Sequence, residues 1–276
     1  MRIDAGTRLF ALLGDPVSHS RSPAMQNAAF AATGLNAVYL PLRCDGEDLP
    51  HLLRAIARSG GGGNITIPHK QAALTAIDVK SRAVIATGAC NTFWLEDGSV
   101  HGDNTDVEGF TAAATALIGS ITGKRVFVSG AGGAARAAVF ALLESGAQTI
   151  TVANRDEQRA RAVASELDAE GGRVRVAELS SYRGAAYDLI VNATSLGLQE
   201  DDEIPFVLPA LSRVGAVLDL VYRPGGTALV HQAAAMGIPA RDGFDMLLTQ
   251  GAAAFQLWFR RNAPFDVMRG ALLEEN

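Results

Sequence analysis

The sequence contains little cysteine and no residue pattern typical of a metal site. Only two of its 276 residues are cysteines, Cys44 and Cys90, and their spacing matches neither a disulfide framework nor a metal-binding motif. The five histidines form no H-E-x-x-H motif and no group at ligand spacing. We therefore expect two small buried cysteines, a reducing cytoplasmic setting and no bound metal.

Long apolar runs and an excess of positive charge are also missing. No stretch reaches the roughly 18 uncharged apolar residues of a membrane helix, and the first residues contain no apolar run typical of a secretion signal. The formal net charge of −5 argues against a general nucleic-acid binder, which would present a basic face. With 48% apolar and 19% charged residues, the chain is typical of a globular protein. We expect a small-molecule partner, no nucleic acid and no membrane.

The first hundred residues alternate between strand-like and helix-like segments. The expected strands are residues 8–14, 38–42, 64–67 and 91–95. The expected helices are residues 22–33, residues 47–58 and a segment that starts near Lys70. Ser22 is expected as the N-cap of the first helix, with Pro23 at its first helical position. Four glycines at residues 60–63 are expected to interrupt the pattern, which otherwise predicts a mostly parallel α/β sheet.

A second run of the same kind begins near Lys124. Its expected strands are residues 125–129, 149–153, 173–177, 188–191 and 216–221. Its expected helices are residues 134–145, 156–169, 227–236 and 245–261. We therefore predict two α/β domains: residues 1–105, completed by residues 243–276, and residues 106–242. The last helix is expected to return to the first domain.

A glycine-rich turn lies between the first strand and the first helix of this second run. Its residues fit the pattern G-x-G-x-x-A and are Gly130, Ala131, Gly132, Gly133, Ala134 and Ala135. Glycines at these positions allow a tight turn and let a pyrophosphate approach the backbone N–H groups of a helix N-terminus. The turn thus predicts a Rossmann-type dinucleotide-binding domain; the alternative is a turn that uses glycine for packing alone.

The next strand ends where the adenosine ribose of a dinucleotide would lie. Asn154, Arg155 and Asp156 occupy this end, and Arg159 follows one helical turn later. An arginine here favours the 2′-phosphate of NADP, whereas a carboxylate favours the 2′-hydroxyl of NAD. We expect NADP, with NAD left possible. The alternative for both arginines is a solvated helix start.

Three segments among the first 106 residues carry polar groups suited to a ligand. Ser20 and Ser22 can donate to an anion at a helix N-terminus, although capping alone would explain Ser22. Lys70 follows a strand at an expected helix start, where the helix dipole disfavours a cation, although most lysines are merely solvated. Asp106 is a candidate acid–base group, although capping of the following helix is the alternative.

Nine segments, taken in order along the chain, are similar to those of one enzyme family. They are GDPVSHSRSP (14–23), NITIPHK (64–70), GACNT (88–92), GDNTDVEGF (102–110), GAGGAARA (130–137), NR (154–155), NATSLGL (192–198), DLVYRPGGT (219–227) and GFDMLLTQGAAAFQLW (243–258). On these motifs the chain resembles the shikimate dehydrogenase family, which includes quinate/shikimate dehydrogenases, over nearly its whole length. The resemblance implies a substrate-binding domain, a Rossmann-type domain and a C-terminal helix that returns to the first.

The resemblance also implies an activity and a set of site residues. The implied activity is the reversible reduction of 3-dehydroshikimate to shikimate with NADPH, a step in aromatic amino-acid biosynthesis, by a monomer or a homodimer. Lys70 and Asp106 match the catalytic acid–base pair. The substrate-binding matches are Ser20, Ser22, Thr66, Asn91, Tyr222 and Gln250. The cofactor-binding matches are Gly130, Ala131, Gly132, Gly133, Ala134, Ala135, Asn154, Arg155, Asp156, Arg159, Thr194, Ser195, Leu220 and Gly243.

Several positions depart from the family pattern. Asp156 stands where many NADP-using members have Thr or Ser, and Gln26 stands where many have His. Leu198 replaces a common Met, and Phe259-Arg260 replaces a common Thr-Gly. These departures keep open a quinate/shikimate dehydrogenase that uses NAD. A catalytically silent nucleotide or metabolite sensor on the same scaffold is a separate alternative, and it predicts the loss of Lys70 or Asp106, both of which are present.

Overall fold

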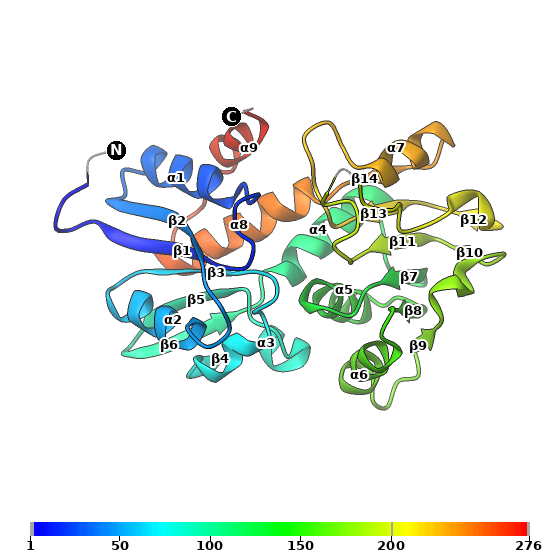
Figure 1. Cartoon of the computed structure of the whole chain (residues 1–276), viewed down its shortest axis with the longest axis horizontal. Helices are drawn as coiled ribbons and strands as arrows, with labels where there is room; N and C mark the ends of the chain where they lie inside the picture. Colours follow the sequence, from blue (N-terminus) through cyan, green and yellow to red (C-terminus); the bar gives the residue numbers. More distant parts are fainter. Residues whose placement is uncertain (1–2, 200, 275–276) are drawn as a thin grey trace. The chain divides into compact units, whose positions relative to one another are not determined.

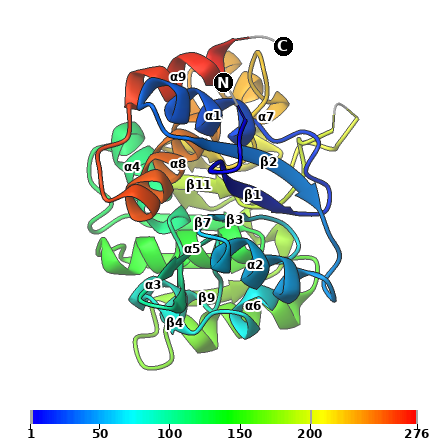
Figure 2. The ribbon, with the colours of Figure 1, turned by 90° about the vertical axis from the view of Figure 1, so that its left-hand side faces the viewer.

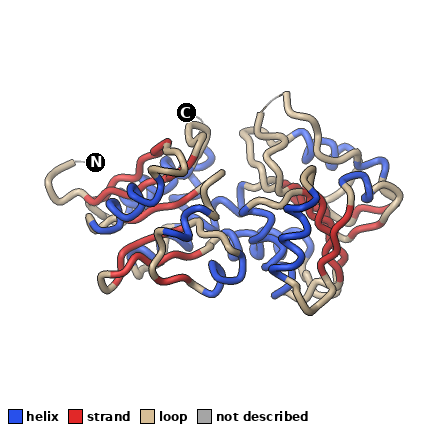
Figure 3. The backbone as a smooth tube through the Cα atoms, turned by 60° about the horizontal axis from the view of Figure 1, so that its bottom comes forward, coloured by secondary structure: helices blue, strands red, loops and turns tan. Residues whose placement is uncertain are grey.

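The computed structural model describes residues 3–199 and 201–274, which divide into two units, each built around its own sheet. Unit 1 combines the chain up to Thr105 with the chain from Leu247 onward, and unit 2 runs from Asp106 to Met246. In both units the strands lie between helices (Figures 1 and 3). The chain therefore leaves unit 1 once and comes back to it.

The sheet of unit 1 has six strands in the order β2-β1-β3-β5-β6-β4. Their bounds are β1 Arg8–Gly14, β2 Ala37–Arg43, β3 Gly62–Ile65, β4 Val79–Lys80, β5 Thr92–Glu96 and β6 Ser99–Asp103. Strand β1 runs parallel to β2 and β3, but β5 runs antiparallel to both β3 and β6. Strand β4 runs parallel to β6, so β5 alone runs against the other five strands, and the sheet is mixed but mostly parallel, as expected.

The glycine run at residues 60–63 was expected to interrupt the pattern of strands and helices. It instead runs into the middle of this sheet. Strand β3 begins at Gly62, and a Cβ atom on Gly63 would lie only 2.1 Å from the carbonyl oxygen of Ala11 in β1. A Cβ atom on Gly61 would lie 1.8 Å from the carbonyl oxygen of Leu9. The glycines are needed because the two backbones approach more closely than any side chain would permit.

Two further expectations for unit 1 are corrected. Strand β6 was not expected, although Asp97 and Gly98, both with positive φ, form the kind of Asp-Gly turn that signals a hairpin. The helix expected to start near Lys70 is only a single 3₁₀ turn, Ala72–Thr75. The chain turns there because it has to reach the short edge strand β4.

The returning helices complete unit 1. Its helices are α1 Ser22–Ala32, α2 Leu49–Arg58, α3 Arg82–Thr87, the part of α8 (Phe244–Phe259) from Leu247 onward, and α9 Phe265–Leu273. Phe255, Trp258 and Phe259 of α8 contact the rings of Phe10 and Phe30, with ring centroids 5.0–6.2 Å apart. In Figure 2 the orange and red end of the chain accordingly lies beside the blue α1. Burial of these rings attaches the C-terminal helices to unit 1.

Unit 2 has a six-stranded sheet that is parallel throughout, in the order β14-β13-β11-β7-β8-β9. The bounds are β7 Arg125–Ser129, β8 Thr149–Ala153, β9 Val174–Ala177, β11 Leu189–Asn192, β13 Val217–Asp219 and β14 Ala240–Arg241. Counted in chain order, this arrangement is the 3-2-1-4-5-6 order of the Rossmann fold. The predicted fold class is confirmed, including the Rossmann-type domain and the returning C-terminal helix.

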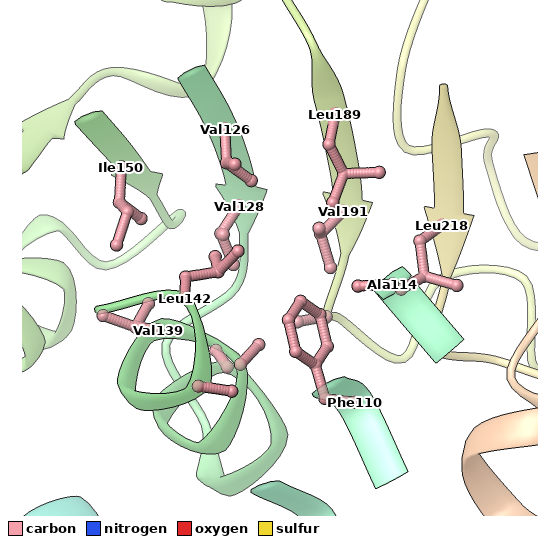
Figure 4. Packing of buried hydrophobic residues seen from close by; sticks show 14 of the residues in the cluster. Phe110, Ala114, Val126, Val128, Val139, Leu142, Ile150, Leu189, Val191 and Leu218 are labelled. Carbon is pink, nitrogen blue, oxygen red and sulfur yellow. The ribbon is translucent and has the colours of Figure 1, made fainter. Parts of the chain in front are cut away.

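Helices cover both faces of this sheet. They are α4 Asp106–Ile118, α5 Gly133–Glu144, α6 Glu157–Leu167 and α7 Ala228–Ala235; the short elements are β10 Ala186–Tyr187, β12 Arg213–Val214 and the 3₁₀ turns Leu179–Tyr182 and Leu208–Ala210. Phe110 of α4 and Leu142 of α5 pack with Val126, Val128 and Val191 of the strands (Figure 4). This apolar layer holds the strand ends, and hence the loops that follow them, in place.

The described residues yield two further findings. None of their helices has both the length and the apolar character needed to cross a membrane. Cys44 and Cys90 are both buried and neither forms a disulfide, as predicted.

Candidate functional site

The serine loop of unit 1 leads directly into α1. Helix α1 begins at Ser22, so the prediction that Ser22 is its N-cap is wrong: Arg21 occupies that position without a side-chain cap bond. Instead, the Ser20 hydroxyl oxygen accepts a hydrogen bond from the Ser22 N–H at 3.2 Å. Two hydroxyl groups therefore lie at a helix N-terminus, where the helix dipole favours a carboxylate.

The backbone around Lys70 is held from several sides. The N–H of His69 donates to the carbonyl of Thr66 at 2.9 Å, and Nε2 of the buried His69 ring lies 2.8 Å from the carbonyl oxygen of Cys44. The Lys70 carbonyl accepts from the N–H of Cys90 at 2.8 Å. These contacts give a flexible side chain a firm base, as a catalytic lysine requires.

Asn91 lies in a buried hydrogen-bond network with Thr105 and Gln250. Its Oδ1 accepts from the backbone N–H of Thr105 at 2.8 Å, and its Nδ2 donates to the Thr105 hydroxyl at 3.0 Å and lies 3.5 Å from Gln250 Oε1. Because a backbone N–H can only donate, this contact fixes which way the amide faces. The Asn91 NH₂ group therefore faces the Thr105 hydroxyl and Gln250 Oε1, which links the segment just before β5 to the returning helix α8.

Two residues that the sequence did not single out support Asn91 from behind. The buried Asn64 donates to the Thr92 hydroxyl at 2.8 Å and accepts from the buried Tyr39 hydroxyl at 2.8 Å. The Thr92 hydroxyl in turn donates to Asn91 Oδ1 at 3.0 Å. Asn64 could have been identified from the sequence, because it shares a strand face with Thr66. No neighbouring motif in the sequence pointed to Tyr39.

The glycine turn of unit 2 has the form of a dinucleotide cradle. Gly130 has a φ of 116°, and a Cβ atom there would lie 2.6 Å from the carbonyl oxygen of Ala193 in the loop after β11. Helix α5 starts at Gly133 with the extended Gly132 as N-cap and no side-chain cap. The N–H groups of its first turn are thus left to a ligand, and a pyrophosphate fits them.

The end of β8 carries the groups expected at the adenosine ribose. Asp156 is the N-cap of α6: its Oδ1 accepts from the N–H groups of Gln158 and Arg159 at 3.0 and 3.4 Å. Its Oδ2 lies 3.5 Å from Arg159 Nε, and Asn154 donates to its carbonyl oxygen. The carboxylate is therefore engaged by the helix start, whereas the Arg155 side chain is exposed.

The loops after β11 and β13 meet at a buried carboxylate. Asp219 is fully buried and accepts from Asn192 Nδ2 at 2.8 Å, Val221 N–H at 3.1 Å and the Thr227 hydroxyl at 2.7 Å. Burial raises the pKa of the Asp219 carboxyl to about 6; the three hydrogen bonds oppose this rise, and the charge of Asp242 adds to it. Neither Asn192 nor Asp219 was predicted as a site residue.

The predicted residues are distributed over both units. Unit 1 contains Ser20, Ser22, Thr66, Lys70, Asn91 and Gln250, and unit 2 contains Tyr222 and every predicted cofactor residue. Asp106 is the first residue of α4 and is buried. Within unit 2, the N–H of Gly243 donates to the Val221 carbonyl at 3.0 Å, so Gly243 lies against the segment that contains Leu220 and Tyr222. Thr194 and Ser195 follow β11, beside Gly130.

Among residues 3–199 and 201–274, no three or more His, Cys, Asp or Glu side chains come together as they would around a metal ion. The polar groups of the site are instead hydroxyls, amides, an ammonium and carboxylates. This set suits a polyhydroxylated organic acid and a nucleotide.

Three family profiles match the chain in succession. The "Shikimate dehydrogenase substrate binding domain" matches residues 12–93, "Shikimate / quinate 5-dehydrogenase" matches residues 112–198, and "Shikimate 5'-dehydrogenase C-terminal domain" matches residues 243–273. The chain is 43% identical to the NADP⁺-dependent shikimate dehydrogenase of Rubrobacter xylanophilus, over 99% of this chain and 98% of that one. The chain belongs to the shikimate dehydrogenase family.

Solved structures of family members share its fold over nearly the whole length. Shikimate 5-dehydrogenase from Thermus thermophilus, in complex with NADP(H) and shikimate, is 38% identical with a TM-score of 0.84, covering 96% of this chain and 98% of that one. Quinate dehydrogenase from Corynebacterium glutamicum, in complex with NAD, is 33% identical with a TM-score of 0.88, covering 97% and 99%. Both likenesses thus extend over both units of the chain.

The raised pKa of Asp219 predicts a pH-dependent stability. The folded carboxyl titrates near 6 and the unfolded one near 3.8, so the folded state binds the proton more tightly. Between these values, the free energy of unfolding of the wild type should fall with rising pH, by about 3 kcal/mol relative to Asp219→Asn. Urea unfolding of both proteins from pH 4 to 8 measures this difference. A difference that stays constant over the range would contradict the prediction.

Proposed function

We propose that this chain is an NADP-dependent shikimate dehydrogenase that catalyses the reversible reduction of 3-dehydroshikimate to shikimate. The observation that carries the proposal is its full-length similarity to NADP⁺-dependent members of the family, which extends through both units. The thiols of Cys44 and Cys90 are buried and form no disulfide, which is consistent with the cytoplasm as the place where the enzyme acts. We propose that the enzyme acts as a monomer or a homodimer.

We assign the chemistry to Lys70 and Asp106, and substrate binding to polar groups mainly of unit 1. Ser20 and Ser22, helped by Tyr222, would bind the ring carboxylate. Thr66, Asn91 and Gln250 would bind the ring hydroxyls, with the Asn91 amide held in one orientation by the Thr105 backbone. In this assignment residues 1–105 and 243–276 form the substrate domain and residues 106–242 the nucleotide domain.

The reaction requires a group that donates a proton to the ketone oxygen, and the acid–base pair would supply it. The nicotinamide of NADPH, when bound, supplies a hydride to the ring ketone. Negative charge then develops on the ketone oxygen, and the Lys70 ammonium would stabilise that charge and donate a proton to it. The Asp106 carboxylate, in the same assignment, would be the second member of the acid–base pair. General acid–base help of this kind contributes about 10²–10⁴-fold to the rate.

The end of β8 supports NADP over NAD. A carboxylate selects NAD by accepting from the ribose 2′-hydroxyl, but the Asp156 carboxylate already accepts from two N–H groups of α6. Arg155 is exposed beside it and is suited to a 2′-phosphate. The glycine turn, Asn154, Arg159, Thr194, Ser195, Leu220 and Gly243 would complete the cofactor site.

Quinate is a second candidate substrate, and Gln26 favours it. Gln26 is fully buried and donates to the Gly251 carbonyl at 2.9 Å, but its Oε1 has no partner among the described residues. It follows Ser22 by four residues on α1, so both lie on one helix face. Quinate carries a hydroxyl on the same carbon as its carboxylate, and that hydroxyl suits the unpaired acceptor.

The proposed function is tested by four assays. Shikimate and quinate are each oxidised with NADP and with NAD, and kcat/KM is obtained from the absorbance of the reduced nicotinamide. We expect shikimate with NADP to exceed every other pair by more than about tenfold, or about 1.4 kcal/mol of transition-state preference. A preference for quinate or for NAD would favour the second candidate, and no turnover with intact NADP binding would favour a sensor.

Lys70→Ala should lower kcat by about 10²–10⁴-fold, because the developing alkoxide loses its acid. The affinity for NADP should change little, since the substitution leaves unit 2 untouched. Steady-state kinetics and cofactor titration measure both quantities. Lys80→Ala removes an exposed lysine of the same unit and serves as the control. Turnover of Lys70→Ala at the wild-type rate would rule out the assigned role.

Arg155→Ala should lower kcat/KM with NADP by about 10–100-fold, because a charged hydrogen bond to the 2′-phosphate is lost. The value with NAD should stay within about twofold. The matched control is Arg161→Ala, an exposed arginine of α6 that pairs with Glu157. Equal losses with both cofactors would show that Arg155 does not read the 2′-phosphate.

A further inference from the structure

Asp219, the last residue of β13, is a buried charged group to which the proposed mechanism gives no role. It is fully buried and lies at the carboxyl end of the sheet in unit 2, the end at which Rossmann domains bind nucleotides. A buried carboxylate lowers stability unless it is well paired. The hydrogen-bond partners of Asp219 therefore indicate which part of the structure this carboxylate supports.

The first partner is Asn192, which shapes the loop after β11. The Asp219 carboxylate can only accept, so the Asn192 NH₂ group has to face it, at 2.8 Å. The same NH₂ group donates to the Leu196 carbonyl at 3.0 Å. Asn192 Oδ1 then accepts from the N–H and the hydroxyl of Thr194 at 3.1 and 2.7 Å. The Asn192 amide, whose orientation is fixed by Asp219, Leu196 and Thr194 together, thus connects the buried carboxylate to residues 193–196.

The other partners shape the segment after β13. The Val221 N–H donates to Asp219 Oδ1 at 3.1 Å, which turns the chain just before Tyr222. The Thr227 hydroxyl donates to Oδ2 at 2.7 Å and accepts from the Val230 N–H at 3.3 Å as the N-cap of α7. One carboxylate therefore holds two loops that leave neighbouring strands.

These two loops adjoin the glycine turn. The first of them passes so close that a Cβ atom on Gly130 would lie 2.6 Å from the Ala193 carbonyl oxygen. We propose that Asp219 is a positioning residue, which holds these two loops as the wall that orients the nicotinamide for hydride transfer. This inference rests on the proposed function, because it takes the loops to border the cofactor. Small displacements of a reacting group lower a rate strongly while leaving remote contacts unchanged.

The test separates the nicotinamide end from the adenosine end in the full-length protein. Hydride transfer is followed in single turnovers by nicotinamide absorbance, with the best substrate and cofactor pair from the four assays. Binding of 2′,5′-ADP, which lacks the nicotinamide, is measured by calorimetry. We expect Asp219→Ala to slow hydride transfer by about 30-fold, with the Kd of 2′,5′-ADP within about twofold of the wild type.

Asp219→Asn provides a second, milder variant. It keeps an acceptor for Asn192 and Val221 but turns an NH₂ group toward Thr227, so we expect transfer to slow by about fivefold. Asp188→Asn is the matched control: Asp188 directly precedes β11, at the opposite end of that strand from Asn192, and accepts from the Arg125 N–H at 2.9 Å. Its transfer rate should stay within about twofold of the wild type.

The outcomes divide clearly. The proposal is overturned if both Asp219 variants transfer hydride at the wild-type rate, or if Asp219→Asn loses rate and 2′,5′-ADP affinity in the same proportion. If Asp219→Ala fails to fold, slower transfer by Asp219→Asn than by Asp188→Asn supports the proposal, and equal rates overturn it. Failure of the proposed function appears separately, as a different preferred pair in the four assays.

Discussion

A polar group that is taken out of water needs a hydrogen-bond partner, and both sheets of this protein meet that need near the ends of their strands. In unit 1, Asn64 and Thr92 are paired with each other and support the amide of Asn91. In unit 2, Asn192 and Asp219 are paired with each other and support two loops. In each case the paired groups lie behind residues that we assign to a ligand, so the bonds that reduce the penalty of burial would also hold the ligand-binding groups in place.

This arrangement decides which chemical groups a ligand has to offer. Asn91 is bound to the Thr105 backbone through its oxygen, so its NH₂ group faces Thr105 and Gln250. Gln26 donates to the Gly251 carbonyl and leaves an acceptor. Asp156 is engaged by the start of α6, and we have therefore proposed the exposed Arg155 as the charged group for a cofactor phosphate. In our proposal, substrate preference and cofactor preference therefore depend on the direction of these hydrogen bonds as much as on residue type.

Apolar packing supplies the frame in which these polar groups are held. The rings of Phe255, Trp258 and Phe259 attach the returning helix to Phe10 and Phe30, which brings Gln250 to the buried amide of Asn91. Phe110 and its neighbours do the same for the strands of unit 2. The chain can therefore complete its first unit with its last residues, at the cost of closing a long loop, because the buried rings more than offset the lost chain entropy.

Much of this protein follows from its sequence alone, because local rules act on neighbouring residues. Five strands of unit 2 (β7, β8, β9, β11 and β13) and the glycine turn between β7 and α5 were predicted, since period, turn chemistry and motif spacing are local. The edge strand β14, with only two residues, was not predicted. Strand β6 was missed despite its Asp-Gly turn, and the helix near Lys70 was wrong because the chain has to reach the edge strand β4. Only the tertiary structure decided that the glycines near residue 62 lie inside a sheet, that Tyr39 pairs with Asn64, and that Asp219 pairs with Asn192 and Thr227. Those facts depend on which distant backbone or amide lies opposite each group, and pairing across the fold leaves no trace in local sequence.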